Sequence, residues 1–168
     1  MIEIVRGHLS DCKAEVLVNP VSCSGFAGSG PESFFRERFP EIFHIYEQAC
    51  RRRELTPGQV LVVARATSSP PRYIFHLATR QHWSDSAQVE TILAGLSRLV
   101  TLVEELKVAS IAFPPLLMAS GSSHWDTLLP HIQDNFTVCP HVHVLLFEFP
   151  DSFLPSTSSV FHRYLVGI

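Results

Sequence analysis

The chain has 168 residues, of which 46% are hydrophobic and 17% charged, and its formal net charge is −3. This length suits one domain, the apolar share is enough to bury a core, and the charged share is too low for a disordered chain. The negative balance excludes a generally basic nucleic-acid-binding surface but still allows a local basic patch. No apolar run reaches the ~18–20 residues of a membrane span, and the first residues lack an export signal. We therefore expect a cytoplasmic protein without a membrane partner.

Apolar strand-like segments alternate with helical patterns along most of the chain. In chain order, the sequence predicts strands over residues 2–5, 15–19, 60–64, 72–77, 110–113 and 142–149. It predicts helices over 31–39, 41–53, 88–106 and 124–136, and the helix over 88–106 has the clearest three- and four-residue apolar spacing. Strands separated by helices need crossover connections. We therefore predict an α/β fold with a mixed sheet of about six strands, covered by helices on its faces.

The last segment has a different composition. Residues 155–159 are rich in serine and read as a linker, whereas residues 160–166 are largely apolar. We expect a domain over residues 1–149 and an extension over residues 150–168 that docks on the core or on a partner.

Two loops of small residues each follow a predicted strand and precede a predicted helix. The first comprises Gly25, Phe26, Ala27, Gly28, Ser29 and Gly30, and the second includes Leu117, Met118, Ala119, Ser120 and Gly121. Ligands of open α/β sheets lie beyond the carboxyl ends of the strands. Glycines allow the backbone to approach a phosphate, and a helix N-terminus offers a positive end. Two such loops together favour a ligand with a diphosphate.

Cysteine and histidine give weaker signals. The four cysteines, at positions 12, 23, 50 and 139, are far apart and form no Cys-x-x-Cys pair, so we expect reduced thiols. Cys23 could be a nucleophile, but no histidine of its loop is placed to activate it. His141 and His143 could hold a metal, yet no third ligand is evident, and we expect a solvated or packed pair with neither metal nor cofactor.

Several short segments of the sequence match the motifs of a known family in their order and spacing. They are Gly7 with Leu9, Val18-Asn19, Gly25 to Gly30, Phe39-Pro40, Tyr46 to Cys50, Pro57-Gly58, Pro71 to Ile74, Thr79 to Trp83, Glu90 with Gly95-Leu96, Pro114 to Leu116, and Trp125. Over residues 1–149 the chain resembles the macro domain family, most closely the bacterial branch of DNA ADP-ribosyl glycohydrolase antitoxins. The resemblance implies a three-layer α/β/α sandwich with a cleft for ADP-ribose. It also implies ADP-ribose, or DNA or protein that carries it, as the binding partner, and an ADP-ribosyltransferase toxin as a possible further partner.

The resemblance implies a ligand site with some altered positions. The kept residues are Leu9, which offers its backbone, Asn19 at the end of the second strand, and the glycines of the first loop. His8 replaces the Asp or Asn that holds adenine in relatives, and Ser22 replaces an Asn that faces the distal ribose. In the second loop, Leu117 and Ala119 stand where relatives carry glycine. Phe147 corresponds either to an aromatic ring beside the adenine or to a buried core residue.

The resemblance also implies a catalytic lysine at the position of Arg80. An amine can attack an anomeric carbon once it is neutral, but a guanidinium stays protonated at any working pH. Arg80 could still stabilise a diphosphate or a developing charge as a fixed cation. The substitution therefore separates ADP-ribose binding from lysine-type catalysis. The neighbouring His82-Trp83 pair either faces the substrate or is a structural plug under the cleft.

Three functions are compatible with these residues. The first is a macro domain that recognises ADP-ribose or an ADP-ribosylated group and removes it as a glycohydrolase. The second is a catalytically degenerate macro domain that acts as a binding or protein-interaction module, with the apolar tail as its surface. The third, direct nucleic-acid binding without a nucleotide pocket, predicts an affinity that depends steeply on salt.

Overall fold

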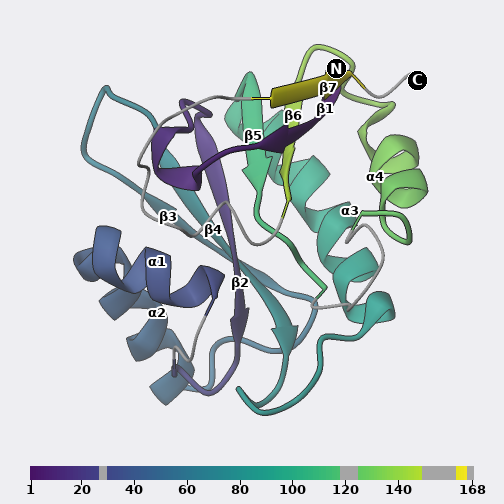
Figure 1. Cartoon of the computed structure of the whole chain (residues 1–168). Coiled ribbons are helices and arrows are strands. Elements are labelled where there is room, and N and C mark those ends of the chain that lie inside the picture. The colour runs from purple at the N-terminus through teal and green to yellow at the C-terminus, as the bar shows by residue number, and fades with distance from the viewer. Residues whose placement is uncertain (27–29, 118–124, 149–161, 166–168) are drawn as a thin grey trace.

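The computed structural model of the chain describes residues 1–26, 30–117, 125–148 and 162–165. Seven strands form one sheet in the order β3-β4-β2-β5-β6-β1-β7 (Figure 1). They are β1 (Ile2–Arg6), β2 (Val16–Ser22), β3 (Val60–Ala64), β4 (Tyr73–Arg80), β5 (Ser110–Phe113), β6 (His143–Phe147) and β7 (His162–Leu165). The five central strands are parallel, whereas β3 and β7 pair antiparallel at the two edges. The predicted mixed sheet is confirmed, and β7 adds a strand to the predicted set.

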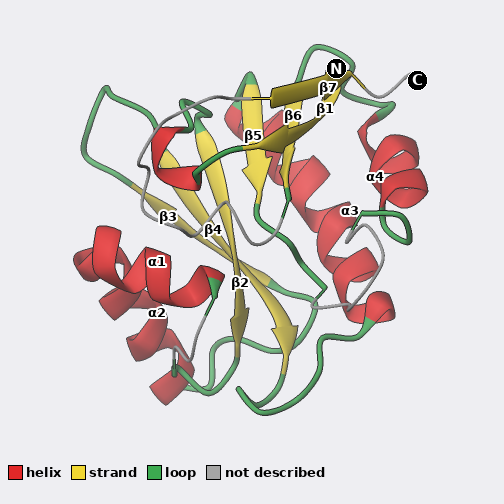
Figure 2. Cartoon of the chain, viewed as in Figure 1, coloured by secondary structure: helices red, strands yellow, loops and turns green. Residues whose placement is uncertain are grey.

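Helices cover both faces of the sheet. Figure 2 shows α1 (Pro31–Arg38) and α2 (Pro40–Arg51) on one side, and α3 (Val89–Leu106) and α4 (Leu129–Phe136) on the other. A short 3-10 helix, η1 (Leu9–Asp11), follows β1. The predicted three-layer α/β/α arrangement is therefore confirmed. Within the described ranges, none of the helices has the length and apolar character needed to cross a membrane.

Two apolar cores follow from the alternation of side chains along the strands. On β2, Val16 and Val18 pack in a core with the buried face of α3, and Leu17 and Val21 pack in a second core with α1 and α2. This alternation holds the sheet between its helices and fixes which strand residues face α1 and α2.

Two strands run further than predicted, and both extensions matter for the site. β2 ends at Ser22 rather than at residue 19, and β4 ends at Arg80 rather than at residue 77. Pro20 donates no backbone hydrogen bond, which usually confines proline to strand ends and edges. However, β2 pairs with β5 only at Val16 and Leu17, so one side of the strand needs no donors beyond that point. The continuing pairing with β4 carries β2 through to Ser22.

The predicted helix over 124–136 begins later than expected. Residues 125–128 form turns, and α4 starts at Leu129. The Trp125 carbonyl accepts bonds from the amides of Leu128 and Leu129, and its fully buried side chain donates from Nε1 to the carbonyl of Phe147 at 3.0 Å. This anchoring fixes the turn before the helix begins.

Candidate ligand-binding site

The five parallel strands bring their carboxyl ends to one edge of the sheet, where open α/β sheets bind ligands. His8 follows β1, Ser22 ends β2, Arg80 ends β4, Leu117 follows β5, and Phe147 ends β6. β2 and β4 end toward the bottom of the view in Figure 1. The parallel topology thus gathers predicted site residues that are far apart in the sequence.

The loop after β2 has the backbone that its glycines predict. Gly25 and Gly30 have φ angles of +74° and +81°, a region that residues with a side chain rarely adopt. Gly30 is the N-cap of α1 and makes no side-chain capping bond; Pro31 at the first helical position carries no N–H, and the amide of Ser33 donates to the Gly30 carbonyl at 3.2 Å. Such a helix start favours an anion. The predicted residues Ala27, Gly28 and Ser29 lie outside the described part of the chain.

A buried polar cluster lies behind this loop. Asn19 is fully buried, and its amide nitrogen donates to Nδ1 of His76 at 3.1 Å. The ring of Tyr46 stacks on the ring of His76 with the centroids 5.3 Å apart. Burial lowers the pKa of His76 to about 3, so its imidazole is neutral and can accept this bond.

The same cluster holds the end of β2. The hydroxyl of Tyr46 donates to the Ser22 carbonyl at 2.7 Å, and burial raises the pKa of Tyr46, which keeps this donor protonated. Ser22 Oγ lies 2.7 Å from Ser24 Oγ. Sequence reasoning did not identify His76. The one available signal was a polar residue between apolar neighbours on a predicted strand.

Arg80 is paired with a buried acid. Its Nη2 contacts Oε1 of Glu32, whose side chain is 2% exposed, while the side chain of Arg80 is 20% exposed. Glu32 lies in the first turn of α1 and Arg80 at the end of β4. Sequence reasoning missed Glu32 because the contact joins two elements 48 residues apart. The charge of the guanidinium is therefore compensated within the protein.

Three further predicted residues have mainly local roles. The Nδ1 atom of His8 accepts from the amide of Ser10 at 3.2 Å and so caps η1. Leu9 is fully buried, and the side chain of Phe147 is 1% exposed, as expected for a core residue. Phe147 packs in the core beside α1 and α2 and also lines a surface pocket, so its two interpretations both stay open.

An exposed aromatic pair lies at the rim of this edge. The rings of Phe26 and Trp83 are 5.3 Å apart and tilted by 51°. Trp83 is 48% exposed, so it is not a plug under a cleft. The ring of His82 lies 5.6 Å from that of Trp83.

The remaining candidates are less informative. Leu117 is half-buried, and Met118, Ala119, Ser120 and Gly121 lie outside the described residues. Burial raises the pKa of Cys23 to about 11, which opposes the formation of a thiolate nucleophile.

The histidine pair is explained by neighbouring acids. His141 and His143 lie 3.6 Å from Glu104 and 3.2 Å from Glu3, respectively. No group of three or more metal-ligating side chains occurs among the residues that the structure describes.

The fold and the position of this edge site define an α/β/α domain of the macro type. The chain matches the Macro domain family model over residues 18–129. It is 35% identical over 148 residues to the DNA ADP-ribosyl glycohydrolase of Thermus aquaticus, covering 88% of this chain and 41% of that protein. The chain belongs to the macro domain family, and it spans less than half the length of the curated relatives that it matches.

Solved structures agree with this assignment. The macrodomain of Thermus aquaticus DarG matches with a TM-score of 0.82 and 35% identity, covering 88% of this chain and 98% of that chain. The structure of Thermosipho africanus DarTG in complex with ADP-ribose matches with a TM-score of 0.70 and 20% identity, covering 85% of this chain and 40% of that chain. At that identity the second likeness supports the fold alone.

Proposed function

We propose that this macro domain binds an ADP-ribosyl group at the carboxyl edge of its parallel strands. The observation that carries the proposal is the loop after β2, whose glycines Gly25 and Gly30 have positive φ angles and lead from the end of a parallel strand into the positive end of α1. A diphosphate supplies the matching acceptors. Since β7 pairs with β1 at the far edge of the sheet, we assign recognition to residues 1–149 and treat 150–168 as an extension.

For the group that carries the ADP-ribose, we propose DNA in preference to protein. The support is the resemblance to relatives named DNA ADP-ribosyl glycohydrolase. A further relative, 22% identical, is named as a fusion of a DNA ADP-ribosyl transferase with such a glycohydrolase. We therefore propose an ADP-ribosyltransferase as the partner whose product this chain recognises, and the cytoplasm as the place where both act.

The ion pair between Arg80 and Glu32 favours binding over lysine-type turnover. A guanidinium does not become a nucleophile, and here a buried carboxylate also compensates its charge. Its remaining N–H groups can still donate to a phosphate or ribose oxygen. We propose slow or absent removal of ADP-ribose by this chain.

Calorimetry with free ADP-ribose tests the binding proposal. We expect saturable heat with a 1:1 stoichiometry, and a weaker signal for AMP because AMP lacks the second phosphate and the distal ribose. Absence of heat at millimolar ADP-ribose would favour the alternative, a protein-interaction module with a decayed pocket.

Turnover assays test the catalytic half of the proposal. On ADP-ribosylated DNA, Arg80→Lys alone should gain little, because Glu32 would hold the new amine as an ammonium ion. Arg80→Lys combined with Glu32→Ala should gain turnover, since the amine could then lose its proton. Robust wild-type turnover that Arg80→Ala leaves intact would refute any role for Arg80.

A further inference from the structure

Phe26 and Trp83 form the only contact between two strongly exposed large apolar side chains that the described residues record. The exposed large hydrophobic residues are Met1 (54%), Phe26 (51%), Ile45 (44%), Trp83 (48%) and Val138 (69%). Of these, Phe26 and Trp83 have ring centroids only 5.3 Å apart. Two aromatic rings left in water beside a proposed ligand site represent apolar surface that a ligand could cover.

Hydrogen bonds fix the segments that carry both rings. The amide of Cys23 donates to the carbonyls of Arg80 and Gln81 at 3.0 and 3.1 Å, which joins the ends of β2 and β4. Beyond this junction, the amide of His82 donates to Oδ2 of Asp85 at 2.9 Å, and the amide of Asp85 donates back to the His82 carbonyl at 3.0 Å.

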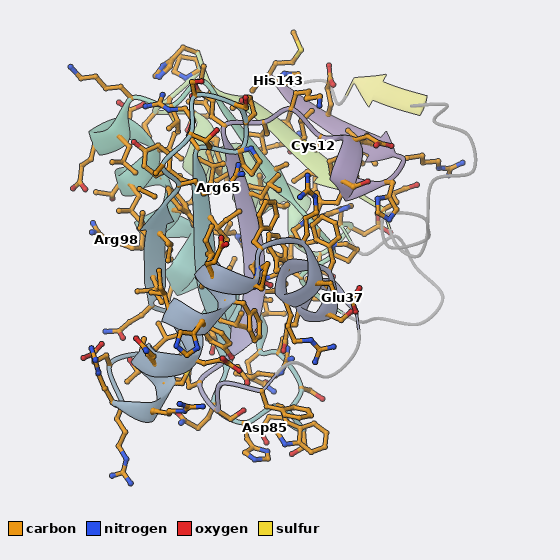
Figure 3. All side chains as sticks on the ribbon, turned by 90° about the vertical axis from the view of Figure 1, so that its left-hand side faces the viewer. Cys12, Glu37, Arg65, Asp85, Arg98 and His143 are labelled. Atoms are coloured by element: carbon orange, nitrogen blue, oxygen red, sulfur yellow. The ribbon has the colours of Figure 1, made fainter. Side chains whose placement is uncertain are left out.

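On the other side of the junction, Phe26 follows Gly25, which packs closely on α2. Figure 3 shows Asp85 at the lower end of the molecule, opposite Cys12 and His143. The rings are therefore presented by closed turns at the carboxyl edge of the sheet.

The surroundings of the pair favour a flat, uncharged group. Arg80, at the end of β4, is paired with Glu32, and Asp85 adds a negative charge to the turn that carries Trp83. A surface that follows a nucleic-acid backbone needs several unpaired basic side chains. Stacking of one base needs only an aromatic face.

A groove opens beside the strand end that precedes Trp83. The groove, of about 510 Å³, is lined by polar side chains that include Arg80, Gln81, Asp85, Ser86 and Gln88. Because Arg80 lines it, the groove adjoins the end of β4, where the ADP-ribosyl group would bind.

We propose that Phe26 and Trp83 form a stacking platform for the nucleobase that carries the ADP-ribosyl group. The proposal rests on the proposed function, because the ADP-ribosyl group would bind at the strand ends while the base to which it is attached covers the rings. The platform then sets specificity for the acceptor without contributing to the binding of free ADP-ribose.

The test compares three probes on matched variants. The probes are free ADP-ribose, a single-stranded DNA oligonucleotide carrying one ADP-ribosylated base, and an ADP-ribosylated peptide. Trp83→Ala should weaken oligonucleotide binding by roughly 5- to 150-fold, the range of base–aromatic stacking, and leave the other two affinities unchanged. Phe26→Ala should act in the same direction, and the control Ile45→Ala, at an exposed site on α2, should change none of them.

Fluorescence provides a second measurement that does not depend on truncation. The chain has two tryptophans, and Trp125 is fully buried whereas Trp83 is exposed. Binding of the modified oligonucleotide should quench the exposed tryptophan, and Trp83→Phe should abolish the quenching yet keep most of the affinity because a ring remains.

The possible failures are distinguishable. Equal losses for all three probes, or no loss for the oligonucleotide, would overturn the platform and leave the proposed function standing. A wild-type chain that binds neither free ADP-ribose nor the modified oligonucleotide would overturn the proposed function itself.

Discussion

The ion pair between Glu32 and Arg80 should make a large and strongly coupled contribution to stability. Removing one partner of a buried pair leaves a charge in a poorly solvated site and costs about 3–5 kcal/mol. Because the side chain of Arg80 is 20% exposed, water can partly solvate the site. We therefore expect Arg80→Ala to lower the free energy of unfolding by about 3 kcal/mol, the low end of that range.

Neutralising the acid should recover most of this loss. In the double variant Glu32→Gln/Arg80→Ala no charge remains in the site, so the deficit should shrink to about 1–2 kcal/mol, mainly from lost packing of the arginine stem. Glu32→Gln alone should cost about 1 kcal/mol, since Arg80 can turn its charge toward water. The double variant should therefore be more stable than Arg80→Ala although it carries one more substitution.

Urea unfolding of the four proteins, followed by circular dichroism at neutral pH, measures these differences. The linear extrapolation gives each free energy of unfolding, and equal m-values would show that the variants unfold the same structure. A loss below about 1 kcal/mol for Arg80→Ala, or a double variant that loses the sum of the two single losses, would refute a buried and coupled pair.

Three further predictions follow from the structure. His76 has a folded-state pKa of about 3, below its ordinary value of 6.5, so the unfolded state takes up a proton first as the pH falls. Between pH 6.5 and 3, the free energy of unfolding of the wild type should therefore fall more steeply than that of His76→Gln, by about 1.4 kcal/mol for each pH unit. Identical pH profiles of the two proteins from urea titrations would contradict this. Gly25→Ala should weaken calorimetric ADP-ribose binding and cost more stability than Gly30→Ala. Both glycines have positive φ, but an added Cβ meets a side chain at 3.1 Å only at Gly25; equal thermal-melt shifts would argue against the steric part. Trp125→Phe should cost about 1–3 kcal/mol in urea unfolding, because the buried carbonyl of Phe147 loses its indole donor, and a change under 0.5 kcal/mol would show that this bond is replaced.

The sequence predicts the frame of this fold well because the frame depends on local apolar patterns. The helix expected over 88–106 is found over Val89–Leu106. Its apolar residues recur at three- and four-residue spacing over the whole helix, a pattern that a strand or loop does not produce. Six of the seven strands overlap the predicted segments, although β2 and β4 extend three residues past them. β7 was missed because four residues at the end of a serine-rich tail carry little periodicity, and only pairing with β1 makes them a strand.

The site is less predictable because its contacts join distant elements. The glycine loop and Arg80 were identified from small residues and from the resemblance, but their partners were not. Glu32 reads as an ordinary first-turn acid, which usually interacts with the helix dipole, and nothing near it in sequence indicates Arg80. His76 lies in an apolar strand, where its neutral state follows only from complete burial.

These misses have one physical origin, which bears on what the chain does. In a parallel sheet, the carboxyl edge is assembled from loops whose order in space differs from their order in sequence. A substitution at one strand end can therefore be compensated by a residue on another element without any change in the fold. The arginine at the end of β4 and the acid at the start of α1 form such a pair, and both side chains lie outside the two apolar cores. The fold would thus tolerate either basic residue at the end of β4, whereas the chemistry would differ: a lysine without the acid beside it could lose its proton and react, and a paired guanidinium can only hold an anion. A chain 35% identical to a DNA ADP-ribosyl glycohydrolase can accordingly keep the fold and yet differ from it in the proposed turnover.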